Sequence, residues 1–353
     1  MLRTWRQRIT LTDIFIWVIG LAIAIAVIWG TITTLRLHLY SGSGWIDLTI
    51  RGLALGGVYA LLAMGYTMVY GILKMINFAH SEVFMSGPFT ASFVAQALSN
   101  SGFLNKQPII SLAILFVVAM AVSGSVALLL ERICYRPLRN APRLVPLITA
   151  IGASFTLQYT FRGLFGSGSF GYPAIKPLQQ YWTINGIQIF RTQVVVIAGS
   201  IVMMLILFGI VQWTKIGKAM RAVSEDKEAA ELMGINVDSI IVFTFGLGGI
   251  SAGAAGILYT LLFPLVNFYM GFTPGIKAFT AAVLGGIGNV PGAFLGAFIL
   301  GLLESVGPNL FLTGLGIPSP SQLKDAIAFI VLVLILIFRP SGILGERISR
   351  DKA

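Results

Sequence analysis

The sequence Lys215-Ile-Gly-Lys-Ala-Met-Arg-Ala-Val-Ser-Glu-Asp-Lys-Glu-Ala-Ala-Glu-Leu-Met-Gly-Ile-Asn-Val-Asp238 is a polar stretch between two long apolar runs. It carries nine of the 37 Lys, Arg, Asp and Glu side chains in the chain. The apolar runs on either side, about 193–213 and 240–263, each have the roughly 20 residues that a helix needs to cross a bilayer. The pattern therefore predicts two membrane-spanning helices joined by a polar connection.

The composition of the whole chain agrees with this local pattern. Of its 353 residues, 10% are charged and 56% are hydrophobic, and the mean hydropathy is +0.88. Soluble domains have about 25% charged residues. Forty glycines are typical of close helix packing and broken helices in lipid. We therefore expect an all-α polytopic membrane protein.

The order of apolar and polar segments predicts about eight to ten transmembrane or re-entrant helices. The expected segments are 12–35, 46–73, one ending near 98, 108–130, 144–165, 193–213, 240–263, two short helices within 276–306, and 323–338. The region 276–306 is too long for one crossing and is interrupted at 285–292, so we expect a turn there. A similar interruption at 75–82 in the other half of the chain would fit inverted repeats.

The positions of the positive charges predict the orientation. Counting from a cytosolic N-terminus, the inside connections and tails hold 16 of the 24 Lys and Arg: Arg3, Arg6, Arg8, Lys74, Arg132, Arg136, Arg139, Arg143, Lys215, Lys218, Arg221, Lys227, Arg339, Arg347, Arg350 and Lys352. This is the positive-inside bias of a membrane protein. It places both termini in the cytosol and accounts for the net charge of +11 without a nucleic-acid partner.

The sequence contains little material for catalysis. The glycine-rich run 285–292 is not followed by the Lys-Ser/Thr of a phosphate-binding loop. His38 and His80 are the only histidines, and Cys134 is the only cysteine, which excludes an intrachain disulfide and argues against a zinc site. We therefore expect no enzymatic activity, no metal site and no cofactor bound by this chain.

Polar residues within or beside the apolar segments are candidates for a translocation path or gate, because burying a charge in a bilayer costs about 2.5–3.5 kcal/mol. The candidates are Asn77, His80, Glu82 and Glu304, with the turn glycines Gly285, Gly286 and Gly288. The alternative interpretation is structural: helix caps, interface anchors and hydrogen bonds between helices. For Lys277 and Lys324, at the starts of segments, we expect snorkelling to the interface.

The polar stretch itself is predicted to contain one short helix, at about 222–236. Ser224 is placed as its N-cap, with acidic residues in the first turn. Gly234 occupies the position of a left-handed C′ residue. Ala229, Ala230 and Met233 would form a small apolar patch suited to docking on another protein. The structural alternative is a solvated loop.

The pattern Glu228-Ala-Ala-x-x-x-Gly234 resembles the EAA signature of ABC-importer permeases, the coupling helix that inserts into the ATPase subunit. Five further stretches resemble the branched-chain amino-acid importer permeases, specifically the LivH-type subunit. They are Tyr59–Gly71, Met75–His80, Glu131–Arg139, Lys277–Gly292 and Pro340–Gly345. The resemblance covers about 46–345 as a permease domain. Residues 1–45 precede this domain and contain an extra apolar segment, as in similar cyanobacterial neutral amino-acid importers. Residues 346–353 form a basic cytosolic tail.

This resemblance implies a permease subunit of an ATP-driven importer in the bacterial inner membrane. Its implied partners are a LivM-type second permease subunit, two cytosolic ATP-binding subunits that hold ATP and Mg, and a periplasmic substrate-binding protein. The residues Ser224, Glu228, Ala229, Ala230, Met233 and Gly234 would couple the permease to the ATPases. The implied substrate is a branched-chain or other neutral amino acid. A permease for urea or short amides, and a stand-alone secondary transporter or channel, remain as alternatives.

Overall fold

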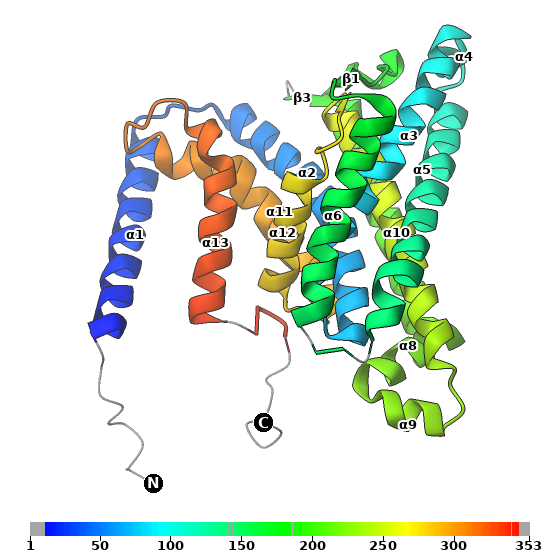
Figure 1. Cartoon of the computed structure of the whole chain (residues 1–353). Helices are drawn as coiled ribbons and strands as arrows, with labels where there is room; N and C mark the ends of the chain where they lie inside the picture. Colours follow the sequence, from blue (N-terminus) through cyan, green and yellow to red (C-terminus); the bar gives the residue numbers. More distant parts are fainter. Residues whose placement is uncertain (1–10, 140, 143, 185–186, 340, 346–353) are drawn as a thin grey trace.

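A computed structural model describes residues 11–139, 141–142, 144–184, 187–339 and 341–345. Figure 1 shows that the described chain is a bundle of helices. The long helices are α1 (Leu11–Arg36), α2 (Gly42–Leu73), α3 (His80–Asn100), α5 (Pro108–Leu130), α6 (Leu144–Phe165), α7 (Arg191–Trp213), α10 (Val237–Leu262), α11 (Phe272–Gly285), α12 (Val290–Gly307) and α13 (Lys324–Phe338). The expected all-α fold is confirmed. The basic residues predicted at 1–10 and 346–353 lie outside the described residues.

Eight helical segments within the described residues are long and apolar enough to cross a membrane. The segments based on α1, α2, α5, α6, α7, α10, α12 and α13 meet this condition. Helix α3 has 21 residues but carries several polar side chains, and α11 has only 14 residues. At 1.5 Å per residue, α11 is about 21 Å long, shorter than the hydrocarbon core of about 30 Å. The region 276–306 therefore forms two helices with a turn between them, as predicted.

Helix α2 lies at the centre of the bundle, and most of its second half is buried. It packs against α12 where both helices carry glycines. A Cβ atom on Gly301 would lie 2.5 Å from the carbonyl oxygen of Gly52 and 2.6 Å from the Cα of Gly56. Gly52 and Gly56 thus allow α12 to approach α2 closely.

Two helices lie at the edge of the bundle. Helix α1 stands apart from the main group in Figure 1, with α13 next to it. It contacts the π-helix η4 (Pro308–Leu312), where the Cβ position of Gly30 is 2.1 Å from the carbonyl oxygen of Phe311. Trp17 and Trp29 on α1 are exposed. Such large exposed apolar side chains are expected where a helix faces lipid or another subunit.

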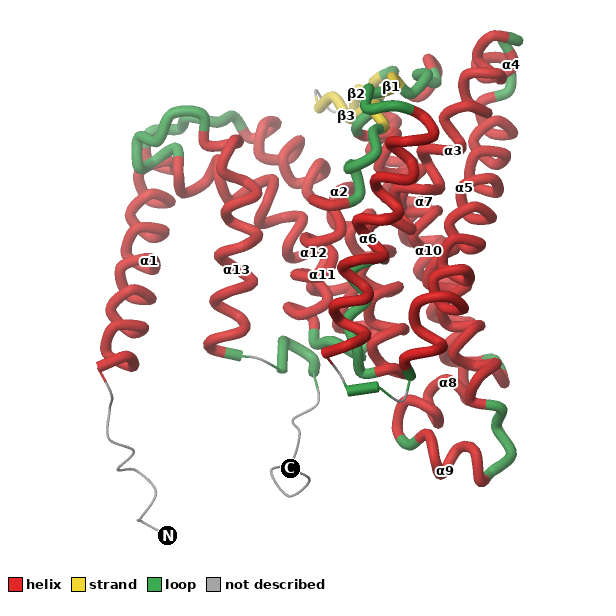
Figure 2. The backbone as a smooth tube through the Cα atoms, in the orientation of Figure 1, coloured by secondary structure: helices red, strands yellow, loops and turns green. Residues whose placement is uncertain are grey.

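The two ends of the bundle differ (Figure 2). One end, called here the β3 end, carries the short strands β1 (Phe170–Gly171), β2 (Tyr181–Ile184), β3 (Ile187–Phe190) and β4 (Leu265–Val266), with α4 (Phe103–Lys106) and the 3-10 helices η3 (Lys176–Leu178) and η5 (Pro320–Leu323). Strands β1 and β4 pair antiparallel, as do β2 and β3. The opposite end, the α9 end, carries α8 (Lys215–Glu225) and α9 (Lys227–Leu232), with η1 (Glu131–Tyr135) and η2 (Arg136–Leu138) nearby.

Candidate functional site

The polar stretch after α7 forms two helices, α8 and α9, and not the single helix predicted. Helix α8 starts at its N-cap Thr214, whose hydroxyl accepts a hydrogen bond from the backbone N–H of Gly217 at 3.0 Å. It continues through Ser224, whose hydroxyl donates to the carbonyl oxygen of Arg221 at 2.7 Å. The prediction that Ser224 is the N-cap is therefore wrong. Asp226 has extended backbone angles, ends α8 and accepts hydrogen bonds from the first turn of α9.

The C-terminal end of α9 has the conformation predicted for it. Gly234 has a φ of +84°, a left-handed conformation that costs an L-residue about 1–2 kcal/mol. The backbone N–H of Ile235 donates to the carbonyl oxygen of Ala230 at 3.1 Å, and the N–H of Gly234 donates to that of Glu231 at 2.9 Å. These two bonds form a Schellman motif. Capped at both ends, α9 has a defined direction despite its six residues.

The apolar residues of α9 are divided between two surfaces. Ala230 is buried within the chain, with 4% of its surface exposed. Leu232 and Met233 are 89% and 83% exposed. The predicted patch of Ala229, Ala230 and Met233 is therefore wrong in part, because Ala230 faces inward and Leu232 joins Met233. The two adjacent apolar residues Leu232 and Met233, directly before Gly234, were the signal that could have found this pair.

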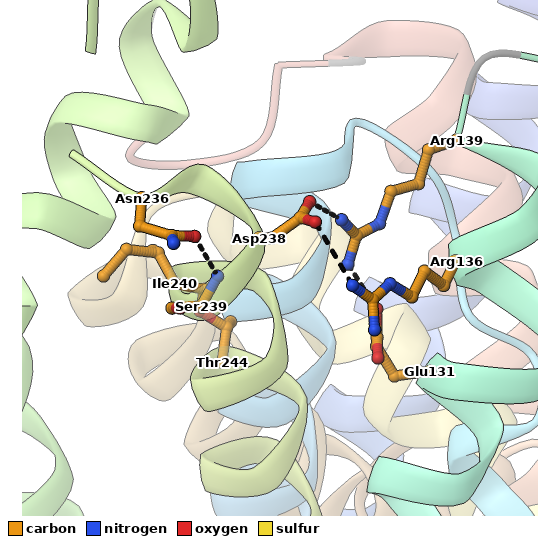
Figure 3. A network of polar contacts seen from close by, with 8 residues as sticks. All are labelled: Glu131, Arg136, Arg139, Asn236, Asp238, Ser239, Ile240 and Thr244. Atoms are coloured by element: carbon orange, nitrogen blue, oxygen red, sulfur yellow. Dashed lines mark hydrogen bonds and ion pairs between the residues drawn. The ribbon is translucent and has the colours of Figure 1, made fainter. Parts of the chain in front are cut away.

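An ion-pair cluster holds the chain after α9 against the end of α5 (Figure 3). Asp238, in the first turn of α10, accepts hydrogen bonds from Arg139 and, at 3.4 Å, from Arg136. Arg139 also pairs with Glu131, whose side chain is 2% exposed. Beside the cluster, Asn236 caps α10 by accepting from the N–H of Ser239 at 2.9 Å. A displacement of α9 would therefore be felt by both α5 and α10.

Three basic residues lie near one another beside the start of α9. The pKa of Lys227, at the first position of α9, is lowered by desolvation and further by repulsion from Arg139 and Lys74. These three cations come from three different connections of the chain. Arg139 is paired with Glu131 and Asp238, so Lys227 and Lys74 are the two of these cations without an ion pair in the described part of the chain.

Asn77, His80 and Glu82 lie between α2 and the first turn of α3, and all three are buried. The amide oxygen of Asn77 accepts a hydrogen bond from the hydroxyl of Tyr135 at 2.7 Å, which links this turn to η1. Glu82 is fully buried and accepts hydrogen bonds from Gln158 of α6 and from two serines. These contacts support the structural interpretation of Asn77 and Glu82. Their part in a translocation path stays a prediction.

Glu304 is at the centre of a second buried cluster that joins four helices. One carboxylate oxygen accepts from Lys277 of α11 at 2.6 Å, and the other accepts from the hydroxyl of Tyr59 of α2 at 3.0 Å. Lys277 also lies 2.6 Å from Asp325 of α13. The prediction that Lys277 snorkels is wrong: its side chain is 3% exposed, because Glu304 and Asp325 stabilise the ammonium inside the protein.

The glycine turn between α11 and α12 holds the chain that follows α13. Gly286 and Gly288 have positive φ angles, of +108° and +98°. The carbonyl oxygen of Gly285 accepts from the N–H of Leu344 at 2.9 Å, and the side-chain amide of Asn289 donates to the carbonyl oxygen of Leu344 at 2.8 Å. These positive φ angles and this close packing give a structural reason for glycine at these positions. The role of the glycines as a gate stays a prediction.

The predicted path residues thus form two separate groups. Gly301 of α12 crosses α2 at Gly52, and Glu304 follows one turn later toward the β3 end. Asn77 lies beyond the opposite end of α2. His80 lies against Gly65 and Tyr66 of α2, whereas Glu304 accepts from Tyr59. The two groups therefore contact α2 at positions six to seven residues apart, about 10 Å along the helix.

No cluster of three or more metal-ligating side chains is found within the residues that the structure describes. Cys134 in η1 is a free thiol and is only partly buried. The described residues therefore present helix-capping, ion-pair and packing chemistry at the places that the sequence singles out.

Comparisons with known proteins agree with this architecture. A family profile described as "Branched-chain amino acid transport system / permease component" matches residues 48–336. The permease protein BraD of the Pseudomonas aeruginosa high-affinity branched-chain amino acid transport system is 40% identical over 308 residues, covering 86% of this chain and 96% of BraD. The corresponding LivH of Escherichia coli is 38% identical over 301 residues, covering 84% and 94%.

More distant similarity reaches another transport system. The autoinducer 2 import permease LsrC of Yersinia pseudotuberculosis is 34% identical over 131 residues, which is 35% of each chain. No solved structure matches the chain. With its membrane-spanning helices and its similarity to BraD and LivH over most of their length, the chain belongs to the family of branched-chain amino acid transport permeases.

Proposed function

We propose that this chain is a permease subunit of an ATP-driven importer for branched-chain or other neutral amino acids. In this proposal it pairs with a second, LivM-type permease subunit in the bacterial inner membrane. Two ATP-binding subunits, which carry ATP and Mg, dock at the α9 end in the cytosol, and a periplasmic binding protein delivers substrate at the β3 end. Residues 46–345 form the permease domain. The names of the relatives and the basic residues at the α9 end support this arrangement.

The observation that carries the proposal is the exposure of Leu232 and Met233 on a helix that is otherwise held firmly. These two adjacent large apolar side chains are 89% and 83% exposed. Helix α9 lies at one end of the bundle (Figure 1). Burying one such side chain in a partner contributes about 1.5–3 kcal/mol. The caps at Asp226 and Gly234 fix the direction in which the pair points. This arrangement fits a docking element for a grooved partner.

The ion-pair cluster provides a route from α9 into the membrane helices. The chain from Gly234 to Asp238 is short, and Asp238 is held by Arg139, which also holds Glu131. Because α5 and α10 pack against each other, a pull on α9 moves them as a unit. In the proposed alternating access, closure of the ATPase dimer shifts the permease between two conformations through this route.

A substitution at Gly234 tests the docking role. Gly234→Val places a β-branched residue at a φ of +84°, where such residues are rare. The strain of about 1–2 kcal/mol or more disfavours the docked conformation of α9, and about 1.4 kcal/mol corresponds to a factor of ten. We expect ATP-driven leucine uptake by the reconstituted importer to fall about tenfold or more, while the variant still inserts into the membrane.

Gly102→Val is the matched control. Gly102 has a φ of +73°, and a side chain there would meet nothing within 4 Å, so the backbone strain is similar but lies at the β3 end. Uptake by this variant should stay near wild type. Unchanged uptake in Gly234→Val would refute the docking role. Uptake of urea or short amides, in place of branched-chain amino acids, would refute the proposed substrate class.

A further inference from the structure

A cavity of about 700 Å³ opens at the β3 end, between α2, α7, α10 and α12. Its apolar wall includes Leu55 of α2 with Leu261 and Leu262 of α10. Two of its polar lining residues, Gln193 of α7 and Glu304 of α12, are buried. The volume is within the range of about 300–1,000 Å³ that is usual for small-molecule sites.

Gln193 is the clearest sign that the cavity is built for a ligand. Its side chain is 5% exposed, and its amide oxygen has no hydrogen-bond partner among the described residues. Leaving a buried polar group unpaired costs about 1–3 kcal/mol. Because Gln193 lines the cavity, its amide can turn to accept a hydrogen bond from a donor on a bound molecule.

Glu304 adds a second, negatively charged acceptor. Each of its oxygens accepts one hydrogen bond, from Lys277 and from Tyr59, and a carboxylate oxygen can accept about two. Lys277 neutralises only one of the two carboxylates that it contacts, Glu304 and Asp325. Glu304 therefore keeps lone pairs that can accept from a ligand. A positively charged donor group makes the strongest such hydrogen bond.

The rim of the cavity has the opposite charge. Lys324 lines it, and its ammonium lies 5.9 Å from the ring centroid of Phe263. It forms no ion pair with any residue in the described part of the chain. Arg51 also lines the rim, but Asp47 pairs with it at 2.8 Å. Lys324 is therefore the cation available to an anionic group.

We propose that this cavity binds a zwitterionic α-amino acid with an apolar side chain. The ammonium group lies toward Gln193 and Glu304, the carboxylate lies toward Lys324, and the side chain packs on the wall that includes Leu55. The inference rests on the proposed function and extends it, because it places a substrate site within the permease subunit itself. The site is at the end where a periplasmic protein would release its cargo.

Equilibrium binding tests this inference directly. The full chain in lipid nanodiscs, without any binding protein, is incubated with radiolabelled leucine. Unlabelled leucine should compete, whereas 4-methylpentanoate, which lacks the ammonium group, and 3-methylbutylamine, which lacks the carboxylate, should compete about tenfold or more weakly. Equal competition by either analogue would overturn the zwitterion assignment.

Gln193→Leu separates binding from structure. The variant removes the unpartnered amide oxygen and keeps an apolar side chain of similar size, so thermal stability should stay equal or rise. We expect the Kd for leucine to rise about tenfold or more. Gln96→Leu, on the exposed side of α3, is the control and should bind leucine as the wild type does.

The two proposals fail in different ways. If the reconstituted importer takes up leucine with ATP but the chain does not bind leucine, or Gln193→Leu binds it unchanged, the cavity inference is overturned and the proposed function stands. If the wild-type assembly shows no ATP-driven uptake of any amino acid, the proposed function itself is overturned.

Discussion

Replacing Lys277 with methionine should destabilise the protein strongly. Lys277 is 3% exposed and lies 2.6 Å from both Glu304 and Asp325. The Asp325 side chain is 47% exposed, so solvent screens that pair, and its loss costs about 1 kcal/mol or less. The Glu304 side chain is 2% exposed and would lose its compensating charge, which costs about 3–5 kcal/mol. Loss of the buried pair therefore dominates the effect.

The measurement is the free energy of unfolding in mixed detergent micelles, for Lys277→Met and for Lys277→Met combined with Glu304→Gln. In the double variant the buried charge is absent, and the glutamine oxygen can still accept from Tyr59. We therefore expect the double variant to recover most of the loss. Lys324→Met, at a partly exposed lysine without an ion pair in the described chain, is the matched control and should change stability by about 0.5 kcal/mol or less.

The unfolding free energies of the single and double variants show whether Lys277 and Glu304 form a buried ion pair. If Lys277→Met is as stable as the wild type, Lys277 and Glu304 do not form a buried ion pair. If the double variant is no more stable than the single one, the loss comes from packing at Lys277 and the electrostatic argument is wrong.

Two further predictions concern α9 and the centre of the bundle. Asp226→Ala should reduce leucine uptake and increase proteolysis of the α8–α9 connection, because losing an N-cap costs about 1 kcal/mol. Ser224→Ala is the control and should change neither uptake nor proteolysis. If Ser224→Ala has these effects and Asp226→Ala does not, Ser224 is the N-cap. Gly301→Leu should lower the free energy of unfolding by about 3 kcal/mol or more, because its side chain would meet the backbone of Gly56. Gly152→Leu is the control: no atom lies within 4 Å of its Cβ position, so the free energy of unfolding should stay equal or rise. An equal decrease in both variants would refute the close contact between α2 and α12.

Local sequence patterns located most helices well. Helices α5 and α6 begin and end at the predicted residues, Pro108–Leu130 and Leu144–Phe165. Each helix satisfies its own backbone hydrogen bonds, so an apolar run of sufficient length is enough to predict a spanning helix. The left-handed Gly234 was predictable for a similar reason, because the glycine and the turn that needs it are adjacent in the chain.

Where two local signals compete, the sequence alone could not choose between them. Ser224 and Asp226 are both good N-cap residues. Asp226 is the cap because α8 buries Gly217, Met220 and Val223 against the bundle, and this packing continues the helix past Ser224. The choice was made by tertiary contacts outside the polar stretch.

The sequence by itself determined the membrane class, the approximate limits of most long helices, and the family. Only the tertiary structure decided which charges pair. Lys277, Glu304 and Asp325 lie on three different helices, and no local pattern indicates that they meet. The physical reason is that a charge in a membrane helix is costly wherever it stands, and the group that offsets this cost can come from any helix that packs beside it.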